Sequence, residues 1–297
     1  MAEISIITVT YNSGFYIEHC LDSIFSQGFK DYEIIAVDNA SEDNTRSIIK
    51  TKYPDVKLIE NPENAGVCKA RNQGIAKAGG KFILCLDHDV RLFDNFLEKI
   101  HSAIKTTDGI GGVQAKILLA DAKTIYSTGI YRSFLRRFYD IGEGKIDTGE
   151  FNKISYVFGI SAAAAIYRRQ ALEDIKQCNQ YFDEDFFYFF EDVDISWRMQ
   201  KKGWRLLYNP EAVCLHAAGR SRNKDKISQY LCMRNRCLMI LKNEPLSGLL
   251  SLFITFLIYD LWRNIFMLVI NPKYFFKAHL GVLRLSARMF RKRYNCL

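Results

Sequence analysis

The sequence lacks the motifs that mark several common classes of nucleotide-binding protein. The first strand-like segment ends in Thr-Tyr-Asn-Ser-Gly at residues 10–14, so it has no Gly-x-Gly-x-x-Gly run, and no Gly-x-x-x-x-Gly-Lys-Ser/Thr run occurs anywhere. These absences argue against a Rossmann dehydrogenase and against a P-loop nucleotidase. No internal repeat or low-complexity linker is visible either, which argues against a repeat protein or a disordered chain.

The eight cysteines include no Cys-x-x-Cys pair. A zinc cage or a dithiol redox motif is therefore disfavoured, and we expect reduced thiols that are mostly buried. The first residues also lack the basic start and the long apolar stretch of a signal peptide. We therefore expect the body of the protein to be cytosolic.

Acidic residues are missing from the last part of the chain. The net charge is +8, from 41 basic and 33 acidic residues, but beyond Asn271 there are seven basic residues and no acidic one, so the rest of the chain carries only about +1. The seven are Lys273, Lys277, Arg284, Arg288, Arg291, Lys292 and Arg293. A generally basic surface is not expected, and we predict no nucleic-acid partner.

Strand-like and helix-like segments alternate through the first part of the chain. With 297 residues and 48% hydrophobic content, one large domain or two small ones can form. The pattern predicts strands over 3–8, 32–37, 56–59 and 81–86, and helices over 16–26, 43–52 and 65–78. It is typical of an α/β fold with a mixed, mainly parallel sheet flanked by helices, in which ligands bind at the carboxyl ends of the strands.

The alternation is less regular after residue 87. We predict helices over 93–105, 170–176 and 191–202, strands over 112–119 and 162–167, and a loop-rich section over 121–147. That section carries Arg132, Arg136 and Arg137, and we expect the stretch up to residue 151 to help cover the substrates.

Residues 247–270 are almost wholly apolar, apart from Asp260, Arg263 and Asn264. The segment is long enough to cross a bilayer, but each charge near its middle would cost roughly 2.5 to 3.5 kcal/mol. An interfacial or re-entrant helical hairpin followed by a polybasic tail is favoured, since apolar burial and attraction to anionic lipid then act together. A membrane span and a buried core or oligomer helix are the alternatives. We expect peripheral or monotopic attachment to the cytoplasmic face of the cell membrane.

Two carboxylates, Asp87 and Asp89, follow the fourth predicted strand. Unpaired buried charges are costly there, whereas alternating carboxylates on a turn can hold a divalent cation that neutralises phosphate oxygens. His216, after the apolar residues 212–215, is either structural or a third metal ligand. Basic residues that follow it can bind a diphosphate or an anionic acceptor: Arg220, Arg222, Lys224, Arg234 and Arg236.

A second acidic cluster begins the predicted helix at residue 191. The helix dipole and capping favour carboxylates at this position, and Asp194 stands at i,i+4 to Arg198, which indicates a structural pair. The aromatic run over 186–190 would place Glu191 and Asp192 in a wall of low dielectric, which can raise the pKa of a carboxylate towards that of a useful base.

Taken in order, these motifs resemble those of family 2 glycosyltransferases of the GT-A fold, over roughly residues 4–243. The resemblance rests on residues 5–12, 33–41, 64–66, 70–74, 86–89, 190–198, 203–204 and 215–221. It implies that the nucleotide contacts Thr8, Tyr11, Asp38, Asn64, Arg71 and Asp87, with Asp38 at a pyrimidine base. It implies that the metal ligands are Asp89, Asp87 and His216. It also implies that Asp192 is the catalytic base, with Glu191 as the alternative. Asp87 is expected to face the ribose or the water shell of the metal. Within the family, the pattern is closest to bacterial and archaeal rhamnosyltransferase-like and galactofuranosyltransferase-like members.

The resemblance implies an inverting glycosyltransferase of the hexosyltransferase type, with Mg²⁺ or Mn²⁺ as cofactor. Its donor would be a UDP- or dTDP-sugar, with GDP still open, and its acceptor a glycan or a lipid-linked glycan in the synthesis of a cell-surface polysaccharide. The expected division is a glycosyltransferase domain over 1–243, with a nucleotide-binding half over 1–110 and an acceptor half over 111–243, and a membrane-attachment region over 244–297.

Two other functions remain as alternatives. A sugar-nucleotide nucleotidyltransferase shares the sheet and the metal carboxylates but normally has a Gly-rich, basic first loop. A non-catalytic membrane scaffold would keep the nucleotide-sugar pocket only for binding, and the intact Glu191–Asp192 pair argues against it.

Overall fold

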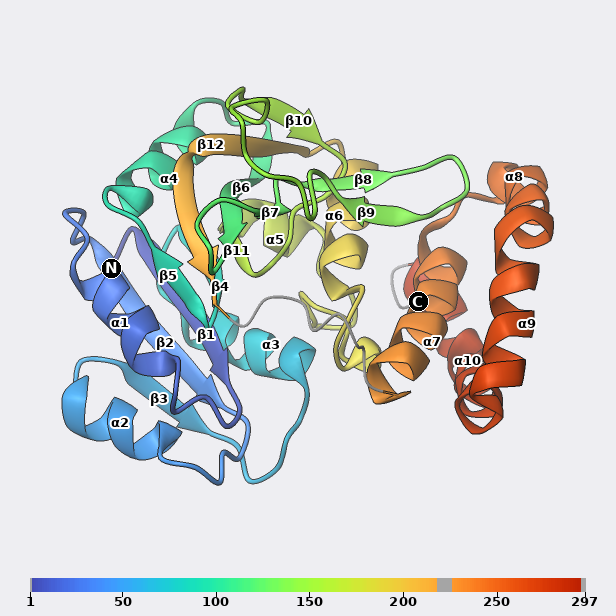
Figure 1. Cartoon of the computed structure of the whole chain (residues 1–297), viewed down its shortest axis with the longest axis horizontal. Coiled ribbons are helices and arrows are strands. Elements are labelled where there is room, and N and C mark those ends of the chain that lie inside the picture. Colours follow the sequence, from blue (N-terminus) through green and yellow to red (C-terminus); the bar gives the residue numbers. More distant parts are fainter. Residues whose placement is uncertain (1, 218–225, 295–297) are drawn as a thin grey trace.

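The computed structural model describes residues 2–217 and 226–294 (Figure 1). Within these ranges, ten strands form one sheet, and eight of them run in the order β10-β12-β6-β11-β4-β1-β2-β3. Two further short strands pair at its side, β5 with β12 and β7 with β6. Helices cover both faces of the sheet, and a group of C-terminal helices lies beyond one end of it (Figure 1).

The first half of the chain supplies the parallel part of the sheet. Its strands pair in parallel, β1 with β2 and β4, and β2 with β3. The strands are β1 (Ile4–Thr10), β2 (Tyr32–Asp38), β3 (Lys57–Glu60) and β4 (Phe82–Asp87), and the helices between them are α1 (Ile17–Phe25), α2 (Thr45–Lys52) and α3 (Val67–Lys77). The predicted alternation is confirmed within a few residues at each end, because apolar periodicity is strong in these segments.

The second half adds antiparallel strands, so the sheet is mixed as predicted. β11 runs antiparallel between β4 and β6, and β12 runs parallel to β6. The elements are β5 (Val90–Leu92), α4 (Phe96–Lys105), β6 (Ile110–Leu119), β7 (Ile125–Ser127), β10 (Ser155–Val157), β11 (Ala164–Arg168), α5 (Arg169–Asp174), α6 (Glu191–Lys201) and β12 (Arg205–His216).

The section expected to be rich in loops contains a separate hairpin. β8 (Ile130–Arg132) and β9 (Phe138–Asp140) pair antiparallel, with Arg132 opposite Phe138 and Ile130 opposite Asp140. Strands of three residues carry too little periodicity to be read from the sequence, because pairing and not local preference stabilises them.

Two apolar clusters cover the two faces of the sheet. Alternate residues of one strand point to opposite faces, so Ile6 joins the cluster that includes α1 and α4, and Ile7 joins the cluster that includes α3, α5 and α6. Both residues are almost fully buried. The carboxyl ends of β1 and β4 are therefore held by strands that pack against apolar side chains on both faces of the sheet.

One expectation about the cysteines is wrong, because Cys178 is disulfide-bonded. Six others are not disulfide-bonded: Cys20, Cys68, Cys85, Cys214, Cys232 and Cys237. The spacing of cysteines along the chain cannot reveal a pair that only the fold brings together.

The C-terminal region is helical, as predicted. It consists of α7 (Lys226–Asn243), α8 (Leu249–Thr255), a π-helical turn (Phe256–Asp260), α9 (Leu261–Ile270) and α10 (Pro272–Arg293), which returns to pack against α7. By length and composition, Ser251–Ile270 is a helix that could cross a membrane, and 11% of its most apolar window is buried. The chain reverses at Asn271-Pro272, so α9 and α10 form a helical hairpin.

Part of the basic tail contacts the protein itself. Lys292 is 5% exposed and forms ion pairs with Asp183 and Asp185, and Arg293 donates hydrogen bonds to the carbonyl oxygens of Leu241 and Glu244. These two basic residues thus bind groups of the protein, and attachment of the tail to lipid stays a prediction. Lys292 binds the protein because the buried carboxylate of Asp183 requires positive partners.

Candidate active site

Three predicted metal ligands meet at the carboxyl end of β4. Asp87 ends β4, and a two-residue turn carries the chain through Asp89 into β5. β5 pairs antiparallel with the end of β12, which places His216 opposite Val90, and the amide of Ala217 donates to the carbonyl oxygen of Asp89. Strand pairing thereby brings His216 to the two aspartates across more than a hundred residues of sequence.

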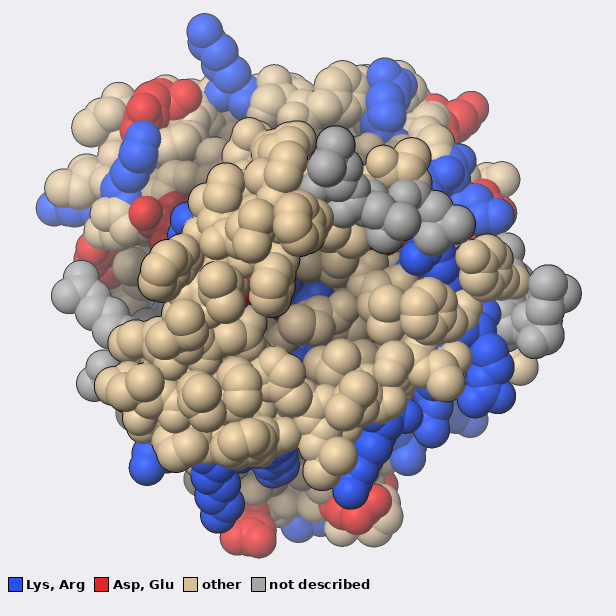
Figure 2. All heavy atoms as spheres, turned by 90° about the vertical axis from the view of Figure 1, so that its right-hand side faces the viewer, with Lys and Arg blue, Asp and Glu red and all other residues tan. Residues whose placement is uncertain are grey.

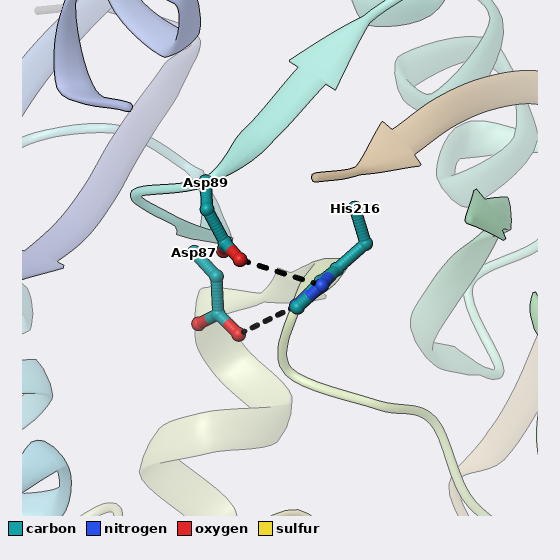
Figure 3. Close-up of side chains that lie close together, drawn as sticks. All are labelled: Asp87, Asp89 and His216. Carbon is teal, nitrogen blue, oxygen red and sulfur yellow. Dashed lines mark ion pairs between the residues drawn. The ribbon is translucent and has the colours of Figure 1, made fainter. Parts of the chain in front are cut away.

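The ligand atoms of Asp87, Asp89 and His216 all lie within 4.8 Å of one another (Figure 3). Nε2 of His216 is 3.6 Å from a carboxylate oxygen of Asp87, and its Nδ1 is 3.4 Å from one of Asp89. Donors at adjacent positions around a six-coordinate Mg²⁺ or Mn²⁺ ion are about 3 Å apart, so a small closing movement suffices. Two hard carboxylates and one imidazole fit such an ion.

Arg71 fixes Asp87 and Glu191 from beneath the cluster. Its guanidinium is 4% exposed and lies 3.0 Å from a carboxylate oxygen of Asp87 and 2.9 Å from one of Glu191. Burial alone would raise the pKa of Asp87, but a hydrogen bond from His216 and the charge of Arg71 outweigh it and lower that pKa to about 2. Asp87 is therefore ionised across the physiological range of pH.

A pocket of about 480 Å³ opens beside the cluster. Asp87, His216, Arg71, Glu191 and Asp192 all line it. Aromatic side chains form much of the remaining wall: Tyr126, Phe138, Tyr139, Tyr188, Phe189 and Phe190. The ring of Tyr126 stacks on that of His216 with 4.5 Å between centroids, which holds the imidazole in place. Concave sites with aromatic walls and a few convergent polar groups are typical of ligand pockets.

Asp192 is the carboxyl group best suited to accept a proton. Burial, and then the charges of Glu191 and Asp140, raise its pKa to about 8. Burial also raises the pKa of Glu191, but one oxygen of Glu191 is bound to Arg71. Asp192 lines the pocket and has no such cation beside it among the ion pairs of the described residues.

The aromatic run before α6 has an unusual backbone. Phe187, Phe189 and Phe190 all have positive φ angles, between 66° and 70°, a conformation that bulky residues rarely adopt. Asn235 of α7 is fully buried, and its amide donates to the carbonyl oxygens of Phe186, Tyr188 and Phe189. Helix α7 thus holds the segment that delivers Glu191 and Asp192 to the pocket.

The predicted pair of Asp194 and Arg198 is confirmed, with 2.9 Å between the ionic atoms. Asp194 is fully buried and also accepts hydrogen bonds from Lys242 and Asn243 of α7. Burial alone would raise its pKa, but the charges of Lys242 and Arg198 outweigh burial and lower that pKa. Asp192 and Asp194 thus lie two residues apart on α6 in opposite electrostatic surroundings. One carboxylate is structural, and the other faces the pocket.

Of the residues predicted to bind the nucleotide, Arg71 and Asp87 line this pocket. The other four lie at or near the carboxyl ends of β1 to β3, outside its lining. Thr8 is fully buried in β1, and Tyr11 is 46% exposed just after it. The carboxylate of Asp38 accepts hydrogen bonds from Thr10 and Ser41, and Asn64 accepts one from the amide of Gly66. Their contacts with a nucleotide stay a prediction.

The basic residues predicted to bind a diphosphate divide into two groups. Arg220, Arg222 and Lys224 lie outside the described residues. Arg234 donates to the carbonyl oxygens of Asp185 and Phe186, and Arg236 pairs with Asp260. Arg234 thus joins α7 to the segment before α6, Arg236 joins α7 to the π-helical turn, and neither lines the pocket beside Asp192.

Sequence reasoning missed Asp140 and Tyr126 as pocket residues. Both come from the section expected to be loop-rich, where no motif surrounds them. That section was expected to help cover the substrates, and it does line the pocket. The one available signal was the alternation around Phe138–Asp140, which is too short to identify a strand.

The fold and the Asp87–Asp89–His216 cluster match the GT-A architecture: a mainly parallel sheet flanked by helices, with an Asp-x-Asp turn after its fourth strand. A family model described as glycosyl transferase family 2 matches residues 5–176. The chain belongs to this family. Its branch within the family, and the residue ranges of its domains, stay predictions.

Curated relatives include the poly-beta-1,6-N-acetyl-D-glucosamine synthases of Staphylococcus epidermidis and Staphylococcus aureus. Each is 26% identical over 213 residues, which cover 71% of this chain and 49% of the relative. The chain therefore spans about half the length of these curated relatives.

Solved structures share the fold. GalNAc-T7 with UDP, GalNAc and Mn²⁺ has a TM-score of 0.64 at 16% identity, over 82% of this chain and 48% of the other. TarS 1-349 of S. aureus has a TM-score of 0.60 at 18% identity, over 100% and 88%. The mannosyltransferase PcManGT of Pyrobaculum calidifontis, with GDP-Man and Mn²⁺, has a TM-score of 0.58 at 17% identity, over 96% and 75%.

Proposed function

We propose that the protein transfers a sugar from a nucleoside-diphosphate sugar to a hydroxyl group of a glycan or lipid-linked acceptor, in the synthesis of a cell-surface polysaccharide. The observation that carries this proposal is the placement of Asp192 in the same pocket as the Asp87–Asp89–His216 cluster. Names of similar proteins support the donor class, since these include structures with UDP-GlcNAc and with GDP-Man. Poly-N-acetylglucosamine synthases among the relatives support the polysaccharide.

The residues of the site have two roles, binding of the metal ion and acceptance of the proton. Asp87, Asp89 and His216 would hold Mg²⁺ or Mn²⁺, which when bound neutralises charge on the leaving nucleoside diphosphate. Asp192 accepts the proton of the acceptor hydroxyl, and its raised pKa suits that task. Direct displacement from the face opposite the leaving group inverts the anomeric centre.

Arg71 keeps Glu191 from serving as the base. Its guanidinium binds Glu191 and Asp87 together, so it sets the spacing between the base helix and the metal cluster. Glu191 is then a positioning residue in this proposal, and Asp192 alone is the base.

The test is turnover of UDP-, dTDP- and GDP-sugars with and without Mn²⁺ or Mg²⁺. Asp192→Asn should lower transfer by at least about a hundredfold while donor binding persists, because general-base catalysis contributes this much. Asp89→Asn should instead weaken the dependence on added metal. Equal turnover by native protein and Asp192→Asn would show that the base is assigned wrongly.

We also propose peripheral attachment to the cytoplasmic face of the cell membrane. Large apolar side chains of α8, α9 and α10 are exposed, among them Phe253, Trp262 and Phe266 at 59%, 65% and 61%. Figure 2 shows this face, mostly uncharged, with basic side chains along its margin. An apolar face bordered by basic groups suits an anionic lipid surface.

A further inference from the structure

A second pocket, of about 430 Å³, lies between the β8–β9 hairpin and the start of α8. The turn of the hairpin and the α7–α8 connection supply its walls, which are polar and basic. Its lining is Arg132, Ser133, Phe134, Arg136, Glu244, Pro245, Ser247, Gly248 and Ser251. The proposed transfer reaction uses none of these side chains.

The charges in this pocket do not balance. Glu244 is 3% exposed and receives two hydrogen bonds from the guanidinium of Arg136, so these two charges cancel. Arg132 is half-buried and has no carboxylate within ion-pairing distance among the residues that the structure describes. Its guanidinium lies instead over the rings of Phe158 and Trp197, 4.9 Å from each centroid. One positive charge is left for a ligand.

Hydroxyl groups line the same pocket. Among the described residues, Oγ of Ser251 is buried without a hydrogen-bond partner, and an unpaired buried hydroxyl is unfavourable. Ser133 accepts a hydrogen bond from the amide of Arg137, which leaves its own hydroxyl proton available to donate. An arginine together with serine hydroxyls matches the several acceptor oxygens of a phosphate group.

The surroundings indicate where such a phosphate comes from. Phe134, at the hairpin turn, is 64% exposed, and Phe253, on α8, is 59% exposed, so the pocket opens at the border of the apolar face. Figure 2 shows that this face is hollowed near its middle, with basic side chains inside the hollow. A phosphate bound where the polar pocket adjoins the apolar face is best supplied by a lipid, because lipid phosphates lie at the boundary between apolar and aqueous layers.

The same hairpin links this pocket to the active site. Ile130, Phe138 and Asp140 at its base line the pocket that contains Asp192. Arg132 is two residues from Ile130, which is about 7 Å along a strand. The β8–β9 hairpin therefore connects the pocket at Arg132 with the wall of the pocket that contains Asp192.

We propose that this second pocket binds the phosphate group of a lipid-linked acceptor, with Arg132 as its cation and Ser133 and Ser251 as hydroxyl donors. This proposal rests on the proposed transfer reaction at Asp192, because the phosphate site specifies the acceptor of that reaction. It selects a phosphate-linked lipid over a free glycan.

The test is calorimetric titration of the full-length protein with decyl phosphate below its micelle concentration, without donor or metal. Arg132→Gln should weaken binding by about tenfold or more, as expected for a lost charge-assisted contact, and Ser251→Ala by a smaller factor. Arg137→Gln is the matched control, since Arg137 is on the same hairpin, lies over Tyr139 and Tyr259, and does not line the pocket.

Two other ligands distinguish a lipid phosphate from free phosphate and from an alkyl chain without phosphate. Decyl glucoside, which has no phosphate, should bind equally to native protein and Arg132→Gln, and sodium phosphate should bind more weakly than decyl phosphate. The proposal is overturned if Arg132→Gln and Ser251→Ala both bind decyl phosphate like the native protein, or if sodium phosphate binds as tightly. Arg132→Lys, which keeps the charge, should retain most of the affinity and guards against a folding defect.

Donor hydrolysis measured in parallel distinguishes this proposal from the proposed function. Arg132→Gln should hydrolyse the sugar nucleotide like the native protein, because the pocket does not touch the metal cluster. Binding of decyl phosphate that does not depend on Arg132, together with intact hydrolysis, refutes the phosphate site alone. Arg132-dependent binding without any hydrolysis refutes the transfer reaction alone.

Discussion

Replacing Asp192 by Asn should stabilise the protein while it abolishes transfer. A buried carboxyl group with a raised pKa holds its proton in the folded state and loses it on unfolding, so it lowers stability at any pH above its unfolded value. At pH 7, a shift from 3.8 to about 8 corresponds to an upper bound of about 4 kcal/mol. Because Asp192 is partly open to the pocket, we expect about half, roughly 2 kcal/mol or about 4 °C in Tm.

The change in stability caused by Asp192→Asn should have a defined sign and a defined dependence on pH. The gain from Asp192→Asn should be absent near pH 4, where both states are protonated, grow as pH rises, and level off near pH 8. The assay is thermal unfolding of metal-free protein at pH 5, 6, 7 and 8. Asp194→Asn is the matched control on the same helix and should destabilise by about 3 to 5 kcal/mol, because Arg198 and Lys242 lose their partner. An Asp192→Asn protein that melts below the native one at pH 8, or a difference independent of pH, would refute this reasoning.

Three further outcomes are expected. Arg71→Met should cost about 3 to 5 kcal/mol in denaturant unfolding, because buried Glu191 and partly exposed Asp87 lose their cation. Adding Glu191→Gln should recover part of that loss, and strict additivity of the two substitutions would contradict the pairing. Asn235→Ala should cost about 1 to 3 kcal/mol and increase hydrogen exchange over residues 186–190, and unchanged exchange there would count against its role. Trp262→Glu should weaken sedimentation with anionic liposomes by more than tenfold, whereas Phe15→Glu, also at an exposed aromatic side chain but outside the C-terminal helices, should not.

The membrane test uses a surface substitution because truncation would disturb the active-site half of the molecule. Lys242 and Lys292 share the buried carboxylate of Asp183, and Lys292 belongs to α10. Removing α10 would leave Asp183 with one cation fewer, next to the helix that carries Asp192. A truncated protein that failed to bind lipid would then report misfolding as readily as loss of a membrane contact.

The sequence alone determined the alternating strands and helices of the first half, since each is long enough to show a periodic apolar face. It also located Asp87, Asp89 and His216, because each follows an apolar strand, and such strands end at the same edge of a parallel sheet. The pair of Asp194 and Arg198 needed only the geometry of one helix turn.

Only the tertiary structure decided what the neighbouring charges do. Glu191 and Asp192 are adjacent acids at the start of one helix, yet Arg71, from α3, binds the first and leaves the second facing the pocket. Lys292 and Arg132 look alike as basic residues, but Lys292 neutralises a buried aspartate, whereas Arg132 faces a pocket and has no acidic partner among the described residues. The energy of a charge depends on the groups within a few ångströms of it, and those groups come from segments far apart along the chain.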